Sequence, residues 1–348
     1  MRPVQPFLAS MRDYEASLQA RFGEAFEPGD LDLKHAHMRE SAFLFLRATC
    51  WRWAEAAPDL CPDLMGAPEV SSVGDAHAGN FGLWRDEEAR LVWGVNDYDE
   101  AAIIPYALDL VRLCASALLG FEDDAHQAAS AVLKGYERGL EEPQPFVLER
   151  RHLWLRDAFA ASDAEREEFW RKLEAAPAAA NDEAYRAPLL RAIGAVEDLR
   201  IVHRSAGVGS LGRPRFVAFG SRGGGPIARE IKGAAASCFK EGWRPGIAQQ
   251  LSRGPHRSPD PMLTYTEAYV LRRLAPNSRK LNFDKLRAKQ GESLLAAMGA
   301  ELASVHAADA GAVTAIKADL GARKPSWLAN ATTRVADWTR QEFSKFRN

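Results

Sequence analysis

Apolar residues in the first half of the chain recur at helical spacing, with short polar interruptions between the runs. Residues 34–57, KHAHMRESAFLFLRATCWRWAEAA, predict one helix that Pro58 ends. Residues 105–120, PYALDLVRLCASALLG, predict another helix, with a proline at its entrance and a glycine at its exit. Residues from about 122 to 197 are predicted to be helical almost throughout, and their interruption AAPAAAND is the best candidate for a linker.

The pattern changes near Leu199. Residues 199–234 alternate apolar and polar positions between glycine clusters, which predicts a strand, a loop, a strand, a turn and a strand. Residues 261–276 predict a second pair of strands. From Gly291 to His306 the apolar residues again share one face of a helix. The patterning therefore predicts an α+β protein in which a small antiparallel sheet lies between two helical parts.

Composition narrows the class of protein. The chain has 348 residues, 47% of them hydrophobic, which is enough for two domains or one large domain with two lobes. A net charge of −2 gives no basic footprint for nonspecific nucleic-acid binding. The four cysteines lie far apart with no C-x-x-C pair, which argues against disulfides and zinc sites and favours a reducing compartment. Without a secretory signal or a long apolar run, we expect a cytoplasmic protein that binds neither membrane nor nucleic acid.

A loop rich in glycine and polar residues, VGDAHAGNFG at positions 73–82, is the first candidate for chemistry. Asp75 could accept a proton from an attacking hydroxyl, and the side-chain amide oxygen of Asn80 could bind a hard cation. Residues 89–95, ARLVWGV, predict a short buried strand after the loop; Asp97 follows this strand, and a short hairpin would place it beside the loop. Mg²⁺ sites commonly combine one or two carboxylates with substrate phosphates. An Asx turn, in which Asp75 and Asn80 cap backbone amides, is the open alternative.

Acidic residues near this loop have simpler expected roles. Asp109 lies within an apolar helix, where a carboxylate is costly to bury unless it is hydrogen-bonded. It would accept backbone amides of the Asp75 loop, or else lie at a helix end near solvent. Asp99 and Glu100 are expected to be solvated turn residues.

A second glycine-rich stretch, GVGSLG, contains Gly207, Gly209 and Gly212. A dinucleotide-binding loop of this spacing must open a helix, but here Pro214 and an alternating strand follow, which argues against that use. A glycine hairpin over nucleotide phosphates is the other physical use of such a loop. Lys232 ends the strand-like segment PIAREIK, from which it could reach phosphate oxygens. Taken without the loop, it would be an ordinary exposed lysine.

Together these segments resemble the protein-kinase-like superfamily, most closely its aminoglycoside phosphotransferase branch. GDAHAGN is similar to that branch's catalytic loop, H-G-D-x-H-x-x-N, and GVNDYDEA followed by PYALDL is similar to its metal-binding strand end and the acid-containing helix after it. More narrowly, GDAHAGNFG, NDYDEA and GVGSLG resemble a bacterial family called domain of unknown function 2252. The resemblance covers about residues 34–120 and 199–307.

The resemblance implies a role for each matching residue of the acidic loops. Asp75 would be the catalytic base, and Asn80 and Asp97 would be the Mg²⁺ ligands, so all three belong to the catalytic set. His77 would shape the loop without reacting. Asp109 would brace it.

On the nucleotide side, the resemblance implies that Lys232 pairs with the phosphates of ATP beneath the loop from Gly207 to Gly212. The glutamate that should pair with this lysine is not identifiable, although Glu241 and Glu267 are both possible. Arg47 lies in a segment that resembles the family, and we favour a structural ion pair for it over contact with phosphate or bracing of the catalytic loop.

Two features depart from the family pattern. Val73 stands where a histidine usually precedes G-D, and the glycine loop follows the catalytic loop in the chain when it ordinarily precedes it. We interpret this order as a circular permutation of a two-lobed, protein-kinase-like fold. Residues 1–197 would form the helical part with the catalytic and metal loops, 198–284 the small nucleotide-binding part rich in strands, and 285–348 the helical return. The backbone from Arg272 to Pro276 would be the hinge that meets the nucleotide base.

The function implied is an ATP- and Mg²⁺-dependent phosphotransferase that acts on a hydroxyl of a small molecule. The alternatives are a nucleotide-binding pseudokinase or scaffold, and a nucleotidyl transferase that uses the same site to attach AMP. Metal-dependent hydrolysis through Asp75, His77 and Asp97 is a further alternative. The leading hypothesis requires Lys232 and Asp97 to lie within reach of one phosphate group.

Overall fold

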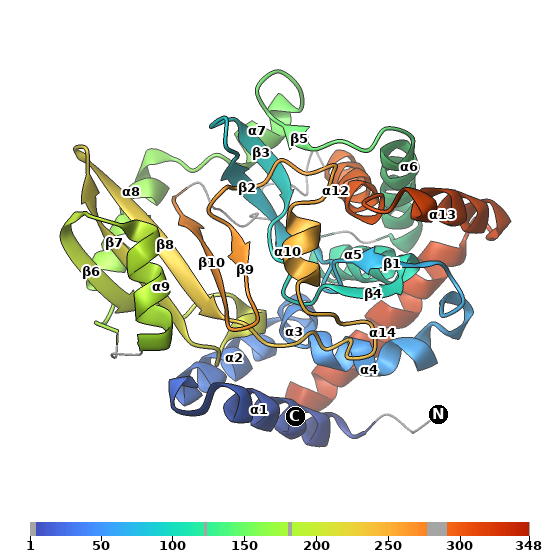
Figure 1. The fold of residues 1–348 in the computed structure, drawn as a ribbon. Helices are drawn as coiled ribbons and strands as arrows, with labels where there is room; N and C mark the ends of the chain where they lie inside the picture. The colour runs from blue at the N-terminus through green and yellow to red at the C-terminus, as the bar shows by residue number, and fades with distance from the viewer. Residues whose placement is uncertain (1–4, 122–123, 180–182, 277–290, 348) are drawn as a thin grey trace.

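The computed structural model describes residues 5–121, 124–179, 183–276 and 291–347. It begins with four consecutive helices, α1 (Phe7–Phe22), α2 (Pro28–Glu40), α3 (Ala42–Ala48) and α4 (Cys50–Leu60). Figure 1 shows a helical part on one side of the molecule and a twisted sheet on the other. The protein is thus of mixed α and β structure with small antiparallel sheets, as the patterning predicted.

The single helix predicted for residues 34–57 is wrong, because the chain divides it at Ser41 and Thr49 into parts of α2, α3 and α4. The Ser41 hydroxyl accepts a hydrogen bond from a backbone amide of α3 at 3.2 Å, and the Thr49 hydroxyl donates to the Phe45 carbonyl at 2.8 Å. Such local side-chain bonds offer the backbone an alternative to a continuous helix. Pro58 does not end α4, which continues for two further residues.

Two small sheets interrupt the helical part, and of their strands only the two of one hairpin, β2 and β3, were expected. Strands β1 (Glu69–Ser72) and β4 (Ala102–Pro105) pair antiparallel, and β2 (Phe81–Arg85), β3 (Leu91–Val95) and β5 (Phe146–Val147) form the second sheet. In the β2–β3 hairpin, Phe81 lies opposite Val95. This register brings the residue before β2 and the residues after β3 to the same end of the hairpin.

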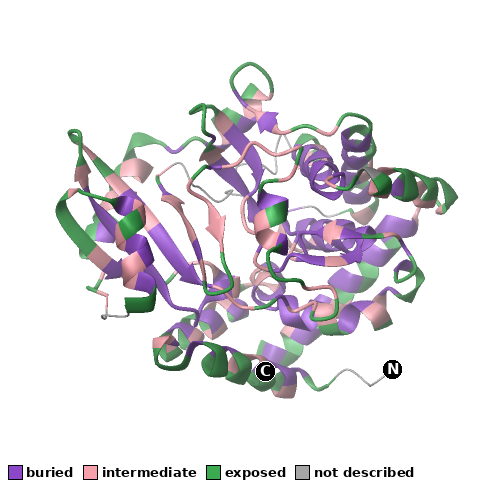
Figure 2. Cartoon of the chain, viewed as in Figure 1, coloured by how far each residue is buried: buried purple, intermediate pink, exposed green. Residues whose placement is uncertain are grey.

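Long helices pack closely behind these strands. They are α5 (Tyr106–Gly120), α6 (Ala125–Glu141), α12 (Gly291–His306), α13 (Ala310–Ala322) and α14 (Trp327–Arg347), with the shorter α7 (Leu153–Phe159) nearby. The predicted bounds of α5 are confirmed, apart from the proline that α5 leaves outside, and the helix predicted from Gly291 to His306 is present as α12. A Cβ atom at Gly135 of α6 would lie 1.8 Å from the carbonyl oxygen of Ala296 in α12, so only glycine permits this crossing. Buried residues, purple in Figure 2, are concentrated here.

The larger sheet has the strand order β6-β7-β8-β10-β9. Its strands, all antiparallel to their neighbours, are β6 (Glu197–His203), β7 (Arg215–Arg222), β8 (Gly225–Gly233), β9 (Thr264–Tyr265) and β10 (Tyr269–Leu274). The strand, loop and strand pattern and the second strand pair were both predicted. Helix α10 (Ile247–Ser252) lies in the connection between β8 and β9.

Side chains of β7 point alternately to the two faces of this sheet, and each face packs against a helix. Val217 and Phe219 pack with α8 (Asp163–Ala175), whereas Phe216 and Ala218 pack with α9 (Glu183–Ile193). The period of two in a strand explains this division. The boundary predicted at residues 284 and 285 lies outside the described residues.

The two ends of the described chain meet. The rings of Phe7 in α1 and Phe346 in α14 lie 5.5 Å apart, and both belong to one buried apolar cluster. None of the helices in the described ranges combines the length and the apolar character that crossing a membrane requires.

Candidate active site

A cleft of about 510 Å³ lies where the glycine loop of the larger sheet faces the loops that begin β2 and follow β3. It receives side chains from α3, from the loop containing Asp75, from the segment after β3 and from the end of β10. Residues that line it include Arg47, Asp75, His77, Asn80, Asp97, Asp99, Gly207, Gly209, Arg213 and Arg272. Segments that the sequence separates by more than a hundred residues therefore share one cavity.

Asp75 is held by an arginine that the sequence analysis did not single out. The Arg112 guanidinium binds Oδ1 of Asp75 through two nitrogens, at 2.7 and 2.5 Å. The Asp75 carboxylate thus accepts hydrogen bonds from a side chain rather than capping a backbone amide, which disfavours the Asx turn. Burial raises the pKa of Asp75, and the opposing effect of Arg112 does not cancel it.

Asp109 ties this loop to the helices. Its two carboxylate oxygens accept hydrogen bonds from the backbone amides of Val73 and Gly74, at 2.7 and 2.9 Å. The Nε2 atom of His306 in α12 lies 3.1 Å from Oδ2 of Asp109. Asp109 is fully buried, so it does not lie near solvent, and its contacts with the loop amides are those expected for a carboxylate in an apolar helix.

His77 contributes to the shape of the same loop. Its Nδ1 atom accepts a hydrogen bond from the amide of Gly79 at 3.0 Å, and its Nε2 atom lies 3.7 Å from Oδ2 of Asp75. The ring is buried and faces Phe43 edge-on at 6.5 Å. The hydrogen bond from Gly79 fixes the turn. The Nε2 atom lies beside Oδ2, the oxygen of Asp75 that Arg112 does not bind.

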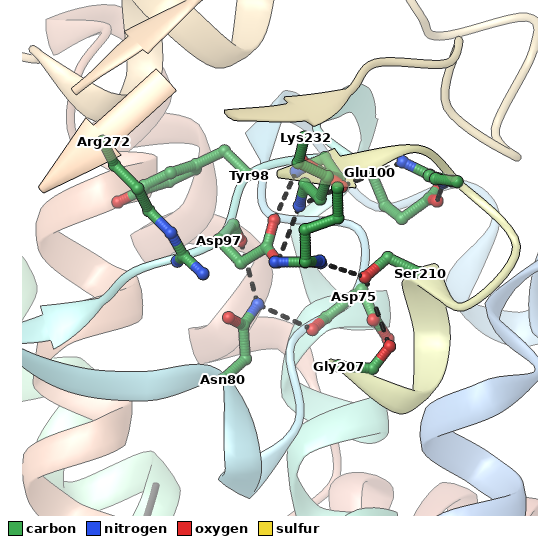
Figure 3. A network of polar contacts seen from close by, with 12 residues as sticks. Asp75, Asn80, Asp97, Tyr98, Glu100, Gly207, Ser210, Lys232 and Arg272 are labelled. Carbon is green, nitrogen blue, oxygen red and sulfur yellow. Dashed lines mark hydrogen bonds and ion pairs between the residues drawn. The ribbon is translucent and has the colours of Figure 1, made fainter. Parts of the chain in front are cut away.

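Asn80 joins the two polar loops at the open end of the β2–β3 hairpin. Its Nδ2 atom donates to the carbonyl oxygens of Asp75 and Asp97, at 3.2 and 2.9 Å (Figure 3). Within the part of the chain that the structure describes, no donor reaches its Oδ1 atom. The amide is therefore oriented by its nitrogen, and its oxygen remains available to a ligand.

Lys232, near the end of β8, lies against the acids of the segment after β3. Its amine is 3.3 Å from Oδ2 of Asp97 and 2.5 Å from Oδ2 of Asp99 (Figure 3). The side chain is buried, so it is not an ordinary exposed lysine. Burial acts to raise the pKa of Asp97, but Lys232 and Arg272 outweigh it and hold that pKa well below its usual range.

Of the two acids expected to be solvated, Glu100 is buried and the side chain of Asp99 is only 10% exposed. Arg213, which follows the glycine loop, binds Asp99 at 2.9 Å and Glu100 at 3.3 Å, and this countercharge makes their burial possible. The second oxygen of Glu100 accepts a hydrogen bond from the amide of Cys238 at 2.7 Å. In the described residues the acid partners of Lys232 are aspartates, and neither Glu241 nor Glu267 contacts it.

The glycine loop joins β6 to β7 and contains one turn of 3₁₀ helix. Gly207 and Gly212 have φ angles of 78° and 92°, which favour glycine. The hydroxyl of Ser210 accepts a hydrogen bond from Arg215 at 2.6 Å and donates one to the carbonyl of Gly207 at 3.2 Å. The loop is followed by a strand, so it does not have the architecture of a dinucleotide-binding turn.

A second buried charge cluster supports the sheet behind the cleft, and sequence reasoning missed it. Glu230 of β8 accepts hydrogen bonds from Arg215 and Arg272, each at 2.8 Å, and also pairs with Arg204. Burial acts to raise the pKa of Glu230, but the three arginines hold it well below its usual range. The sequence offered one signal for this cluster, the acid Glu230 within the strand segment PIAREIK. For Arg112, the signal was a charged residue within the apolar run after Asp109.

The side-chain oxygen atoms around Asn80 and Asp97 are suitable ligands for a hard cation whose remaining ligands are oxygen atoms of other groups. Beyond the free amide oxygen of Asn80, Oδ1 of Asp99 is buried without a hydrogen-bond donor, and the Asp97 side chain is 38% exposed. In the described ranges, no three or more histidine, cysteine, aspartate or glutamate side chains form a group able to hold a metal ion. Mg²⁺ commonly takes one or two carboxylates and completes its coordination with water and phosphate. These residues therefore fit Mg²⁺ bound together with a polyphosphate.

Fold and site define a protein of mixed α and β structure with a cleft that includes two aspartates in its lining, and a buried lysine contacts both of them. The chain belongs to the family described as uncharacterized proteins conserved in bacteria, domain of unknown function 2252, whose profile matches residues 27–172 and 157–348. None of the curated proteins and none of the solved structures matches the chain. The family membership expected from GDAHAGNFG, NDYDEA and GVGSLG is thus confirmed.

Proposed function

We propose that this protein is an ATP- and Mg²⁺-dependent phosphotransferase that acts on a hydroxyl group of a small molecule. One observation carries the proposal: the amine of Lys232 lies 3.3 Å from Asp97, although 135 residues separate them in the sequence. Asp75, Asn80 and the glycine loop open into the same cleft. A base, an acid suited to a metal and a glycine loop that line one cavity, with a lysine against that acid, are the groups that phosphoryl transfer from a nucleotide uses.

The proposed fold is a circularly permuted relative of the protein kinases. In its support, the glycine loop joins the first two strands of the larger sheet and Lys232 lies on the third, β8. Leu274 and Pro276, at the exit of β10, line the cleft where a hinge would meet the nucleotide base.

In this proposal the chain supplies position and charge. Oδ1 of Asp75 is held by Arg112, so Oδ2 is the oxygen that accepts the proton of the acceptor hydroxyl. The acceptor oxygen then bonds to the terminal phosphorus as the bond to the bridging oxygen breaks and ADP leaves. A raised pKa makes Asp75 the stronger base. Lys232 neutralises phosphate charge, while Mg²⁺ held by Asn80 and Asp97 would stabilise the charge that develops on the transferred group.

Binding of nucleotide to purified protein tests the proposal. Calorimetry with ATP or GTP, with and without Mg²⁺, should show Mg²⁺-dependent binding that Asp97→Asn removes. Asp59→Asn is the matched control, because Asp59 is exposed and outside the cleft. Thermal unfolding gives a second readout, since a ligand at a hundredfold excess over its Kd stabilises the native state by about 2.7 kcal/mol. Unchanged Mg²⁺-dependent binding in Asp97→Asn would remove Asp97 from the site.

The same samples separate the alternatives. After incubation with candidate acceptors, mass analysis that finds an added phosphate supports phosphotransfer, and an added AMP supports nucleotidyl transfer. Nucleotide binding with no product on any acceptor supports a pseudokinase. Absence of a thermal shift with ATP and Mg²⁺ in the wild-type protein contradicts the proposal.

A further inference from the structure

Arg47, the penultimate residue of α3, lies where the catalytic and glycine loops meet. A Cβ atom at Gly79 would lie 3.1 Å from Nε of Arg47 and 3.2 Å from its Cζ, so the guanidinium rests directly on the catalytic loop. On the other side, a Cβ atom at Gly209 would lie 3.0 Å from the Arg47 carbonyl oxygen. The arginine also lines the cleft together with Asp75 and Asp97.

The structural ion pair expected for Arg47 is not formed. Across the described residues, its guanidinium has no carboxylate partner, and its Nε atom is buried without a hydrogen-bond acceptor. The nearest aromatic ring is that of Phe43, whose centroid is 5.7 Å from Cζ. Four other arginines that line the cleft each bind an acid: Arg204, Arg213, Arg215 and Arg272.

A guanidinium whose Nε atom is buried without an acceptor requires an explanation, because burying a polar group without a partner is unfavourable. Burial lowers the pKa of Arg47, although Asp75 and Asp97 act in the opposite sense. The planar fork of an arginine matches the geometry of phosphate and carboxylate oxygens. The partner of the Arg47 guanidinium is therefore expected to be an anion that enters the cleft.

We propose that Arg47 is an anion-binding residue of this cleft and holds a phosphate-type oxyanion between the catalytic and glycine loops. This inference rests on the proposed function and deepens it, because that anion is either the terminal phosphate of the nucleotide or a phosphate carried by the acceptor. The guanidinium contacts the catalytic loop, and Arg47 lines the cleft together with Asp75 and Asp97, which places it beside the group that would be transferred. Its role is thus to bind and orient that group, in addition to the neutralisation of phosphate charge by Lys232.

The test compares wild-type protein with Arg47→Met, Arg47→Lys and the control Arg12→Met, in which an exposed arginine with no contact to the cleft is replaced. Calorimetry with inorganic phosphate, with ADP and Mg²⁺, and with ATP and Mg²⁺ gives three affinities for each protein. We expect Arg47→Met to weaken phosphate binding at least tenfold, while Arg12→Met leaves it unchanged. Arg47→Lys keeps the charge but loses the fork, so its affinity should be intermediate, and it replaces Arg47→Met if that variant does not fold.

The nucleotide arms identify the source of the anion. If Arg47 holds the terminal phosphate, Arg47→Met loses at least tenfold in ATP affinity and retains that for ADP. If it holds an acceptor phosphate, both nucleotide affinities stay and only phosphate binding is lost. If the wild-type protein binds phosphate through Arg47 but binds no nucleotide, the proposed function is refuted and the inference that Arg47 binds an anion is supported. Wild-type affinities in both Arg47 variants, or no anion binding by the wild-type protein, would overturn the inference.

Discussion

Two buried charge clusters lie two residues apart on β8, and their composition is opposite. Around Glu230 one acid is bound by three arginines, whereas around Lys232 one amine is shared by two aspartates. The first cluster lies in the sheet, and Glu230 is 1% exposed. The second retains a carboxylate oxygen of Asp99 without a donor and a partly exposed Asp97. A satisfied cluster stabilises the fold, and one with spare donors and acceptors can receive a ligand.

Removal of the acid from the satisfied cluster should have the largest effect. Glu230→Gln leaves three guanidinium groups facing one another around a neutral amide, and breaking a buried charge network of this kind costs roughly 3–5 kcal/mol. Urea unfolding followed by circular dichroism measures the loss. Glu241→Gln, at an exposed position, is the control. A loss below 1 kcal/mol for Glu230→Gln would show that the two clusters do not differ as argued.

Removal of the amine from the other cluster should affect binding more than folding. In Lys232→Met, Asp99 keeps Arg213 and Asp97 can be hydrated, so we expect a loss of only about 1–2 kcal/mol in the free energy of unfolding. Binding of ATP with Mg²⁺ should fall at least tenfold. Urea unfolding and calorimetry on the same preparation measure the two effects. A stability loss equal to that of Glu230→Gln, with nucleotide affinity unchanged, would reverse the assignment.

The dependence of the unfolding free energy on pH should differ least between the two clusters. Both Asp97 and Glu230 have pKa values lowered by folding, so each adds stability that is present above its unfolded pKa, near 4, and is lost as the pH falls. Unfolding free energies measured between pH 7 and pH 3 should therefore decrease. Asp97→Asn and Glu230→Gln should each flatten this decrease. An unaltered slope in both variants contradicts the stabilising role of these ionised groups.

Much of the architecture could be predicted from local pattern, because a strand or helix that buries one face shows its period in the sequence. Residues 199–234, 261–276 and 291–306 gave their elements in this way. The three-way division of residues 34–57 was missed because it depends on the hydroxyls of Ser41 and Thr49, which periodicity does not register.

The site was predictable only where residue types cluster along the chain. Asp75, Asn80 and Asp97 fall within two adjacent loops, and their proximity follows from one hairpin. Partners that come from distant segments, such as Arg213 for Asp99, leave no local trace, because their pairing depends on tertiary packing. That is why Asp99 and Glu100 were mistaken for solvated turn residues.

Gly74 limits how the cleft can open. Its φ angle is 77°, and a Cβ atom there would lie 2.0 Å from the carbonyl oxygen of Glu100, so the backbones of the two acid-bearing loops are in direct contact. The side chain of Asn80 also joins these loops, because it donates hydrogen bonds to the carbonyl oxygens of Asp75 and Asp97. We therefore expect these two loops to move together, so that admission of a bulky ligand depends on movement of the larger sheet with its glycine loop.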